Sequence, residues 1–181
     1  AMIEQPSQSP TLLSPSGLCQ VPIVPRAVQR LKAGLPLVLR SDVTSEPPDD
    51  TELVLLCDLR GQPVATALWV ASGPLAARMW SMQGEGFGEV TLARRLAAAL
   101  ERRRPLLASG ERDAFRVVHG EADLLPGLFV DYYADAVVIQ TATRAMDRRK
   151  PLLADLLAPV SYTHLRPHAT VLDLVFRLLL E

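Results

Sequence analysis

The apolar positions between residues 23 and 83 fall into short runs separated by turn residues. Val, Leu, Ala and Trp dominate these runs, and Gly, Pro and Asp cluster between them. Runs of this kind indicate β-strands, and the spacing of apolar positions over Arg26–Lys32 indicates a short helix before them. Several short strands in so short a stretch predict a small closed or half-closed β barrel. The expected strands are Leu35–Leu39, Glu52–Leu59, Val64–Val70 and Leu75–Met82.

A longer helical pattern follows the barrel. Residues 84–111 are expected to form a flexible Gly-rich linker and then a helix over Thr91–Pro105, with Leu92, Leu96 and Leu100 on one face. Pro105 should end this helix, because proline lacks the backbone N–H that a helix interior needs. Residues 112–158 return to strands and close with a helix. The expected elements are Phe115–His119, Gly127–Tyr133, Ala136–Thr141 and the helix Met146–Leu157.

The pattern as a whole therefore predicts an α+β protein: a small β barrel at residues 23–83, a linker helix, and a partial β-β-β-α domain. The first 22 residues are rich in Pro, Ser and Gln and show no sustained periodicity. Such a segment buries too little apolar surface to offset its ordering entropy. Residues 1–22 are therefore predicted to be disordered.

The overall charge limits the kind of nucleic-acid contact to be expected. The 181 residues carry 19 Lys and Arg against 20 Asp and Glu, for a net charge of −1. A globally basic nucleic-acid-binding protein is thus not indicated, and any RNA contact must use a local patch. The chain has no apolar run of membrane-spanning length and no signal-peptide pattern, and its two cysteines do not form a disulfide framework. We expect a cytoplasmic protein.

Several motifs that resemble functional sites have a simpler interpretation. Gly84–Glu89 approaches a dinucleotide-binding loop, but Glu89 stands where the third glycine is required. His119, Glu121 and Asp123 do not have the spacing of a zinc motif, and a turn whose polar side chains bind backbone N–H groups is favoured. Cys57 lies in an apolar strand that offers nothing to lower its pKa, which indicates a buried small side chain rather than a nucleophile. No catalytic, cofactor-binding or metal-binding residue is predicted in this chain.

Basic residues form two groups. Arg26, Arg30, Lys32 and Arg40 frame the expected barrel, and we predict that they contact RNA phosphates. A second group, Arg94, Arg95 and Arg102–Arg104, lies on the expected linker helix. A charge run on a helix is usually a solvated face, so this group is the second candidate for RNA contact.

The run from Phe115 to Thr141, FRVVHGEADLLPGLFVDYYADAVVIQT, carries a family resemblance. From Arg116 to Tyr133 it is similar to a stretch of the form R-[LV]-[IV]-H-G-E-A-D-x-L-P-G-L-x-V-D-x-[YF]. That stretch is found in bacterial class I S-adenosylmethionine-dependent 23S rRNA (cytosine-5) methyltransferases that begin with a PUA domain. The resemblance implies that residues 23–83 are a PUA-like RNA-binding barrel and that residues 112–158 begin the central α+β domain. It also implies ribosomal RNA as the partner and S-adenosylmethionine as the cofactor of the parent enzyme.

The resemblance also defines what this sequence lacks. In that family the catalytic domain contributes a Gly-rich cofactor loop, an Asp-Pro-Pro-type motif and a nucleophilic Cys in a Pro-rich loop. None of these occurs in the sequence. The chain is therefore expected to be an inactive N-terminal fragment that keeps the substrate-positioning part of the enzyme. The alternative is a stand-alone PUA-like module that binds RNA or another protein.

The C-terminal tail resembles something other than a natural domain. Val160–Glu181 is similar to translated sequencing-adapter read-through, with departures at Pro167 and Ala169. The resemblance implies that the natural sequence ends near Ala158 and that residues 159–181 are artefactual. The tail nevertheless has a helical apolar stripe, at Val171, Leu174, Val175, Leu178 and Leu179.

Overall fold

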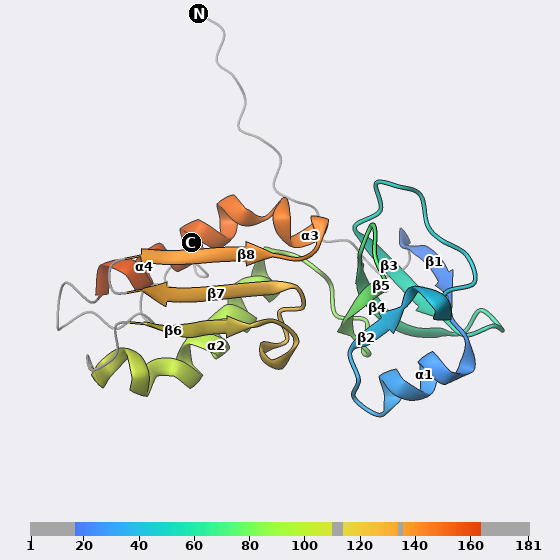
Figure 1. Cartoon of the computed structure of the whole chain (residues 1–181), viewed down its shortest axis with the longest axis horizontal. Coiled ribbons are helices and arrows are strands. Elements are labelled where there is room, and N and C mark those ends of the chain that lie inside the picture. Colours follow the sequence, from blue (N-terminus) through green and yellow to red (C-terminus); the bar gives the residue numbers. More distant parts are fainter. Residues whose placement is uncertain (1–16, 110–113, 134–135, 164–181) are drawn as a thin grey trace, which may run out of the picture.

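The computed structural model describes residues 17–109, 114–133 and 136–163. Figure 1 shows two units side by side: a strongly curved sheet with a short helix, and a flatter sheet with longer helices. This arrangement confirms the predicted α+β fold, with a small barrel, a helix and a further small sheet. No helix of the described part of the chain is long and apolar enough to cross a membrane.

The first unit is a five-stranded sheet that curls into a partly closed barrel. Its strand order is β1-β3-β4-β5-β2. Strand β1 runs parallel to β3, and the other neighbours are antiparallel. A backbone bridge between Ile23 and Val43, which follow the two edge strands in the chain, draws the open edges together. The strands are β1 (Cys19–Pro22), β2 (Leu37–Leu39), β3 (Leu53–Cys57), β4 (Pro63–Trp69) and β5 (Leu75–Ser81).

Strand β1 corrects one prediction. Disorder was expected through residue 22, but Cys19–Pro22 form a strand, and Val21 is fully buried in the barrel core. The pairing with Val54–Cys57 supplies the backbone hydrogen bonds that the local composition could not indicate. Residues 1–16 lie outside the described part of the chain.

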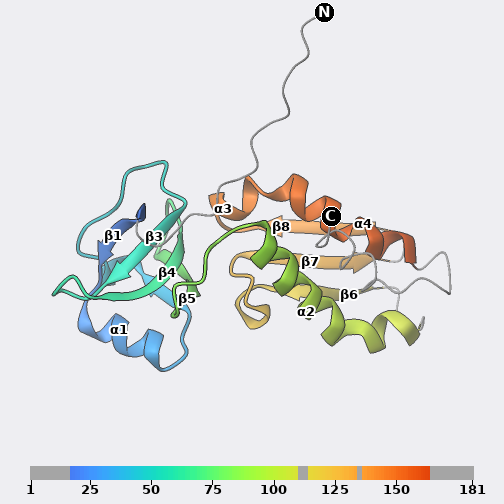
Figure 2. The ribbon, with the colours of Figure 1, turned by 180° about the vertical axis from the view of Figure 1, so that it is seen from behind.

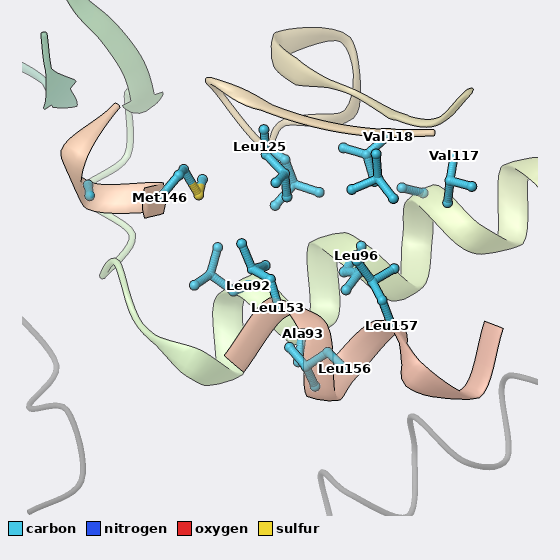
Figure 3. Packing of buried hydrophobic residues seen from close by; sticks show 14 of the residues in the cluster. Leu92, Ala93, Leu96, Val117, Val118, Leu125, Met146, Leu153, Leu156 and Leu157 are labelled. Carbon is cyan, nitrogen blue, oxygen red and sulfur yellow. The ribbon is translucent and has the colours of Figure 1, made fainter. Parts of the chain in front are cut away.

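The second unit places helices on one face of a three-stranded sheet. The sheet has the order β6-β7-β8 and is antiparallel throughout. Helices α2 and α4 lie against the same face of it, as Figure 2 shows from behind. Leucines from both helices meet valines of the sheet in a continuous core (Figure 3). The elements are α2 (Glu89–Ser109), β6 (Ala114–His119), η3 (Gly120–Asp123), β7 (Leu128–Tyr133), β8 (Ala136–Thr141), α3 (Arg144–Asp147) and α4 (Lys150–Thr163).

A β-bulge in β6 determines which side chains reach this core. The register shifts between Arg116 and Val118, so that Val117 and Val118 are both buried beneath the helices. In a regular strand, two consecutive residues would point to opposite faces. The bulge therefore adds one valine to the core and leaves Arg116 and His119 on the other face of the sheet.

Helix α2 is longer than the sequence predicted. It begins at Glu89 and continues past Pro105 to Ser109, so proline does not end it. Proline removes one backbone hydrogen bond from the helix, and α2 packs against β6. Helix α4 likewise runs past Ala158 to Thr163. The rest of the tail proposed as artefactual, residues 164–181, lies outside the described residues.

The segment between the two units is packed, contrary to the prediction of a flexible Gly-rich linker at the start of residues 84–111. Phe87 is buried, and its ring meets the edge of Trp80 with ring centroids 4.9 Å apart. The Ser81 hydroxyl accepts hydrogen bonds from the backbone N–H groups of Gln83 and Glu85. The signal that could have shown this is Phe87 itself, a large apolar side chain among glycines.

Arg95 joins the two units at one point. Its side chain is only 7% exposed, and its guanidinium lies 3.7 Å from the centre of the Trp80 ring of β5. It donates hydrogen bonds to the carbonyls of Trp80 and Leu124 and pairs with Glu85. Leu124 follows η3 in the left-handed conformation, with φ of 59°. The sequence placed Arg95 with the solvated arginines, but it lies three residues after Leu92, on the buried face of α2.

Further ion pairs join the units around this contact. Arg78 of β5 pairs with Glu121 of η3. Glu52, just before β3, pairs with Arg148 and Arg149 near the start of α4. The Arg149 guanidinium also lies 4.3 Å from the centre of the Phe87 ring. Together with the shared apolar core, these contacts fix the orientation of the barrel on the second unit.

One buried carboxylate organises the turn at η3. This agrees with the prediction that residues 119–123 form a turn whose polar side chains bind backbone N–H groups. Asp123 is 3% exposed and accepts a hydrogen bond from the His119 N–H at 2.6 Å. It also pairs with Arg102 and Arg103 of α2. Burial alone would raise the pKa of Asp123, but the hydrogen bonds from Arg103, His119 N–H and Arg102 outweigh it and lower the pKa.

We predict that Arg95→Lys lowers the free energy of unfolding by about 2 kcal/mol, because lysine cannot stack on Trp80 and reach both carbonyls at once. Urea unfolding followed by far-UV circular dichroism measures the change. Arg94→Lys is the matched control, since Arg94 is 61% exposed and pairs with the same Glu85. Equal effects of the two variants would show that Arg95 does not hold the junction.

We also predict that Asp123→Asn destabilises the protein at pH 7 by about 2 kcal/mol. The folded-state pKa lies below the usual value of 3.8, so the stabilisation is present above that value and is lost as pH falls through the folded-state pKa. Thermal melts from pH 7 to pH 2 should show the wild type and the variant converging in acid. Asp147→Asn, at an exposed carboxylate, should leave the melting temperature at pH 7 nearly unchanged.

Candidate nucleic-acid interface

The barrel presents a short basic helix, α1 (Pro25–Lys32), at its surface. Pro25 starts the helix, where its missing N–H costs nothing, and Gly34 follows the helix with φ of 88°. Ala27 and Leu31 face the barrel core, which leaves Arg26, Arg30 and Lys32 turned toward solvent. Three of the four predicted RNA-binding residues therefore lie together on one helix.

A buried aspartate positions the two arginines. Asp42, at the end of η2 (Arg40–Asp42), is 1% exposed. Its Oδ1 accepts a hydrogen bond from Arg26 Nε at 2.6 Å, and its Oδ2 pairs with Arg30. Burial acts to raise the pKa of Asp42, but the hydrogen bonds from Arg26 and Arg30 have the larger combined effect and lower it. Asp42 was not predicted, since no local pattern connects it to a helix twelve residues upstream.

The surface keeps a net positive charge despite this pairing. One carboxylate neutralises one of two arginines, and Lys32 makes no ion pair with any described residue. Arg26 remains 65% exposed. Two arginines held by a shared anion have fewer conformations to lose when they bind a phosphate. The geometry thus suits a small, preorganised phosphate contact.

The guanidinium of Arg40 is engaged in contacts within the barrel. Its guanidinium donates hydrogen bonds to the carbonyls of Val70, Gly73 and Leu75 and pairs with Glu46. It also lies 5.3 Å from the centre of the Trp69 ring. These contacts tie η2 to the β4–β5 turn, so Arg40 is engaged within the barrel. The phosphate-binding prediction is accordingly carried forward for Arg26, Arg30 and Lys32.

An apolar strip lies beside the basic helix. Leu35, Leu37 and Leu39 alternate along β2 and its approach, and all three are exposed. Val38 between them is buried. Helix α1 packs against this strand, so the strip and the three cations belong to one side of the barrel. Such a surface offers both charge and apolar area to a partner.

The second basic group is used within the protein. Arg95 is buried at the junction, and Arg102 and Arg103 both pair with Asp123. Arg94 and Arg104 are exposed and pair with Glu85 and Glu101. Because each of these arginines faces a carboxylate, helix α2 is the weaker candidate for RNA contact.

The remaining candidates are the Cys57 thiol and groups of side chains that could bind a metal ion. Cys57 is buried in β3, and burial raises the pKa of its thiol, as does the nearby Asp58. A thiol of this kind is a poor nucleophile at neutral pH, as the sequence predicted. Within the described residues, no three His, Cys, Asp or Glu side chains are grouped so that they could hold a metal ion.

Comparison with known proteins agrees with this architecture. Residues 21–82 match the family described as PUA-like domain. A ribosomal RNA large subunit methyltransferase I from Erwinia tasmaniensis is 31% identical over 107 residues, which are 59% of this chain and 27% of that protein. A ribosomal RNA large subunit methyltransferase from Deinococcus radiodurans is 34% identical over 122 residues, covering 64% of this chain and 30% of that protein.

A solved structure shows the same fold. A putative SAM-dependent methyltransferase from Streptococcus mutans superimposes with a TM-score of 0.70 at 17% sequence identity, over 81% of this chain and 38% of that one. The chain carries a PUA-like domain, and its similarity to large-subunit rRNA methyltransferases confirms the resemblance seen in its sequence. It spans less than a third of the length of those two relatives.

Proposed function

We propose that this chain is the RNA-binding, substrate-positioning part of an rRNA (cytosine-5) methyltransferase that uses S-adenosylmethionine and acts in the cytoplasm. The observation that carries the proposal is its similarity, over more than half of its length, to large-subunit rRNA methyltransferases. The PUA-like domain and the cations of helix α1 supply a physical means of holding RNA.

In this proposal the chain binds and orients, and the covalent chemistry takes place on another part of the enzyme. A target cytosine is turned out of the RNA, and a cysteine thiolate attacks its ring to activate it. S-adenosylmethionine would supply the methyl group and leave as S-adenosylhomocysteine, and loss of the ring proton and of the thiolate would restore the base. Cys57 is unsuited to the attack because it is buried and its pKa is raised. The fixed junction at Arg95 would hold the bound RNA at a set angle to the rest of the enzyme.

A stand-alone protein-interaction module is the second candidate. The exposed leucine strip at Leu35, Leu37 and Leu39 favours it, because contiguous apolar side chains at a surface often mark a protein contact. The two candidates differ in salt dependence, since phosphate contacts weaken steeply with salt and apolar contacts do not.

We predict weak RNA binding whose affinity falls as salt rises. Three phosphate contacts give a slope of about −2 for log K against log salt on single-stranded RNA, at about −0.7 per contact. Removing all three cations in Arg26→Ala/Arg30→Ala/Lys32→Ala should flatten the slope, as measured by fluorescence anisotropy with an rRNA oligonucleotide. The control removes three cations from the second unit, Arg94, Arg104 and Lys150, all of them exposed. A slope that falls only in the control would place the contact on α2 and α4.

We further predict that the chain alone does not methylate RNA. Burial raises the pKa of the Cys57 thiol, which makes it a poor nucleophile, and the sequence holds no cofactor loop of the kind that the resemblance implies. Incubation with radiolabelled S-adenosylmethionine and ribosomal RNA should leave the RNA unlabelled, with a full-length relative as the positive control. Incorporation above background would show that the chain is itself catalytic.

A further inference from the structure

The face of the sheet β6-β7-β8 that points away from α2 and α4 is not covered by any described helix. Figures 1 and 2 agree that both helices lie on the other side. Tyr133 is 50% exposed and Val138 is 40% exposed on this open face. The strand register arranges its side chains in three rows across the strands: His119–Phe129–Gln140, Arg116–Asp131–Val138 and Ala114–Tyr133–Ala136.

The first row centres on an aromatic ring with polar groups on both sides. The His119 ring lies 6.1 Å from the Phe129 ring, centre to centre, and Gln140 is the register partner of Phe129 on the opposite strand. Gly120 closes one side, since a Cβ at that position would lie 3.2 Å from the Phe129 ring. Its φ of 51° also favours glycine there. The ring is therefore held in place and keeps imidazole and amide groups within reach of whatever rests on it.

The second row adds a fixed cation. Arg116 donates to both carboxylate oxygens of Asp131, at 2.8 and 2.9 Å, through Nε and Nη2. Its guanidinium lies 5.4 Å from the centre of the Phe129 ring, and its Nη1 has no partner among the described residues. Asp131 thus orients the guanidinium over the ring of Phe129, and its Nη1 N–H groups point to no described partner.

The side chains of the open face favour a nucleobase over a protein partner. A protein partner would find one large exposed aliphatic side chain, Val138, and would have to desolvate the Arg116–Asp131 pair. A nucleobase needs an aromatic or guanidinium plane to stack on and polar groups to meet its edge. The row of His119, Phe129 and Gln140 provides both. The ion pair brings little net charge, so the contact would depend on stacking more than on phosphate.

We propose that this open sheet face binds single-stranded RNA, with one base stacked on Phe129 and its edge met by His119 and Gln140. The inference rests on the proposed function and adds a second RNA contact on the unit that the basic helix does not reach. The two contacts differ physically. The site on α1 attracts phosphates and is weakened by salt, whereas the sheet face holds a base and keeps its contribution as salt rises.

The test compares aromatic and aliphatic side chains at matched positions of the full chain. Phe129→Leu keeps the apolar volume and removes the π-face, and Phe129→Tyr restores the π-face. Phe115→Leu is the control, because Phe115 lies in the same sheet but packs against the core on the covered side. Affinity for a fluorescent single-stranded rRNA oligonucleotide is measured by anisotropy at low and high salt. Circular dichroism melts check that each variant folds.

We expect Phe129→Leu to weaken binding about tenfold at both salt concentrations, as loss of one base–aromatic stack does. Phe129→Tyr and Phe115→Leu should stay near wild type. Equal affinities for Phe129→Leu and Phe115→Leu would overturn the inference, while a retained effect of the α1 substitutions would leave the proposed function standing. A wild-type chain that binds no RNA would refute both. Self-association that Phe129→Leu abolishes, seen by sedimentation velocity, would show a second copy of the chain on this face and also overturn the inference.

Discussion

The fold depends on one guanidinium that is shared between two units. Arg95 rises from α2, stacks on Trp80 of the barrel and donates to the carbonyl of Leu124 beyond η3. A buried cation is costly unless it is paired and its hydrogen bonds are satisfied. Both units must therefore be in place before Arg95 is satisfied, and the arrangement resists opening for the same reason. The buried ring of Phe87 and the ion pairs of Glu52 extend this junction to its other side.

The use of arginines in contacts within the protein also explains why so little of the basic charge is available to RNA. Arginines at the junction, at the η3 turn and at the edges of the barrel each face a carboxylate or a set of carbonyls. The composition, nearly neutral overall, conceals this division between structural and free cations. On α1, Asp42 holds Arg26 and Arg30 without cancelling both charges, and Lys32 makes no ion pair with any described residue. An RNA contact on such a protein has to be local, and it gains from groups that act without charge.

Features set by local sequence were predictable, and features set by distant pairing were not. The strands β3, β4 and β5 could be predicted from their apolar runs, because a buried strand is recognised by its own side chains. Strand β1 was missed because its partner β3 lies more than thirty residues further along the chain. The spacing of Arg95 from Leu92 places it on the buried face of α2 and could have indicated its burial. It was missed because arginines on helices are usually exposed. Asp42 gave no signal, since its partners on α1 are defined only once the barrel closes.

The left-handed backbone conformation at Leu124 determines how this residue contacts Arg95. Its side chain is 62% exposed, and only its carbonyl oxygen contacts Arg95. The contact with Arg95 therefore depends on the backbone conformation at position 124 and not on the side chain there. Glycine or asparagine adopts that shape at lower cost than leucine. Glycine or asparagine at position 124 would therefore keep the contact with Arg95, whereas a β-branched residue would strain the backbone that presents the carbonyl.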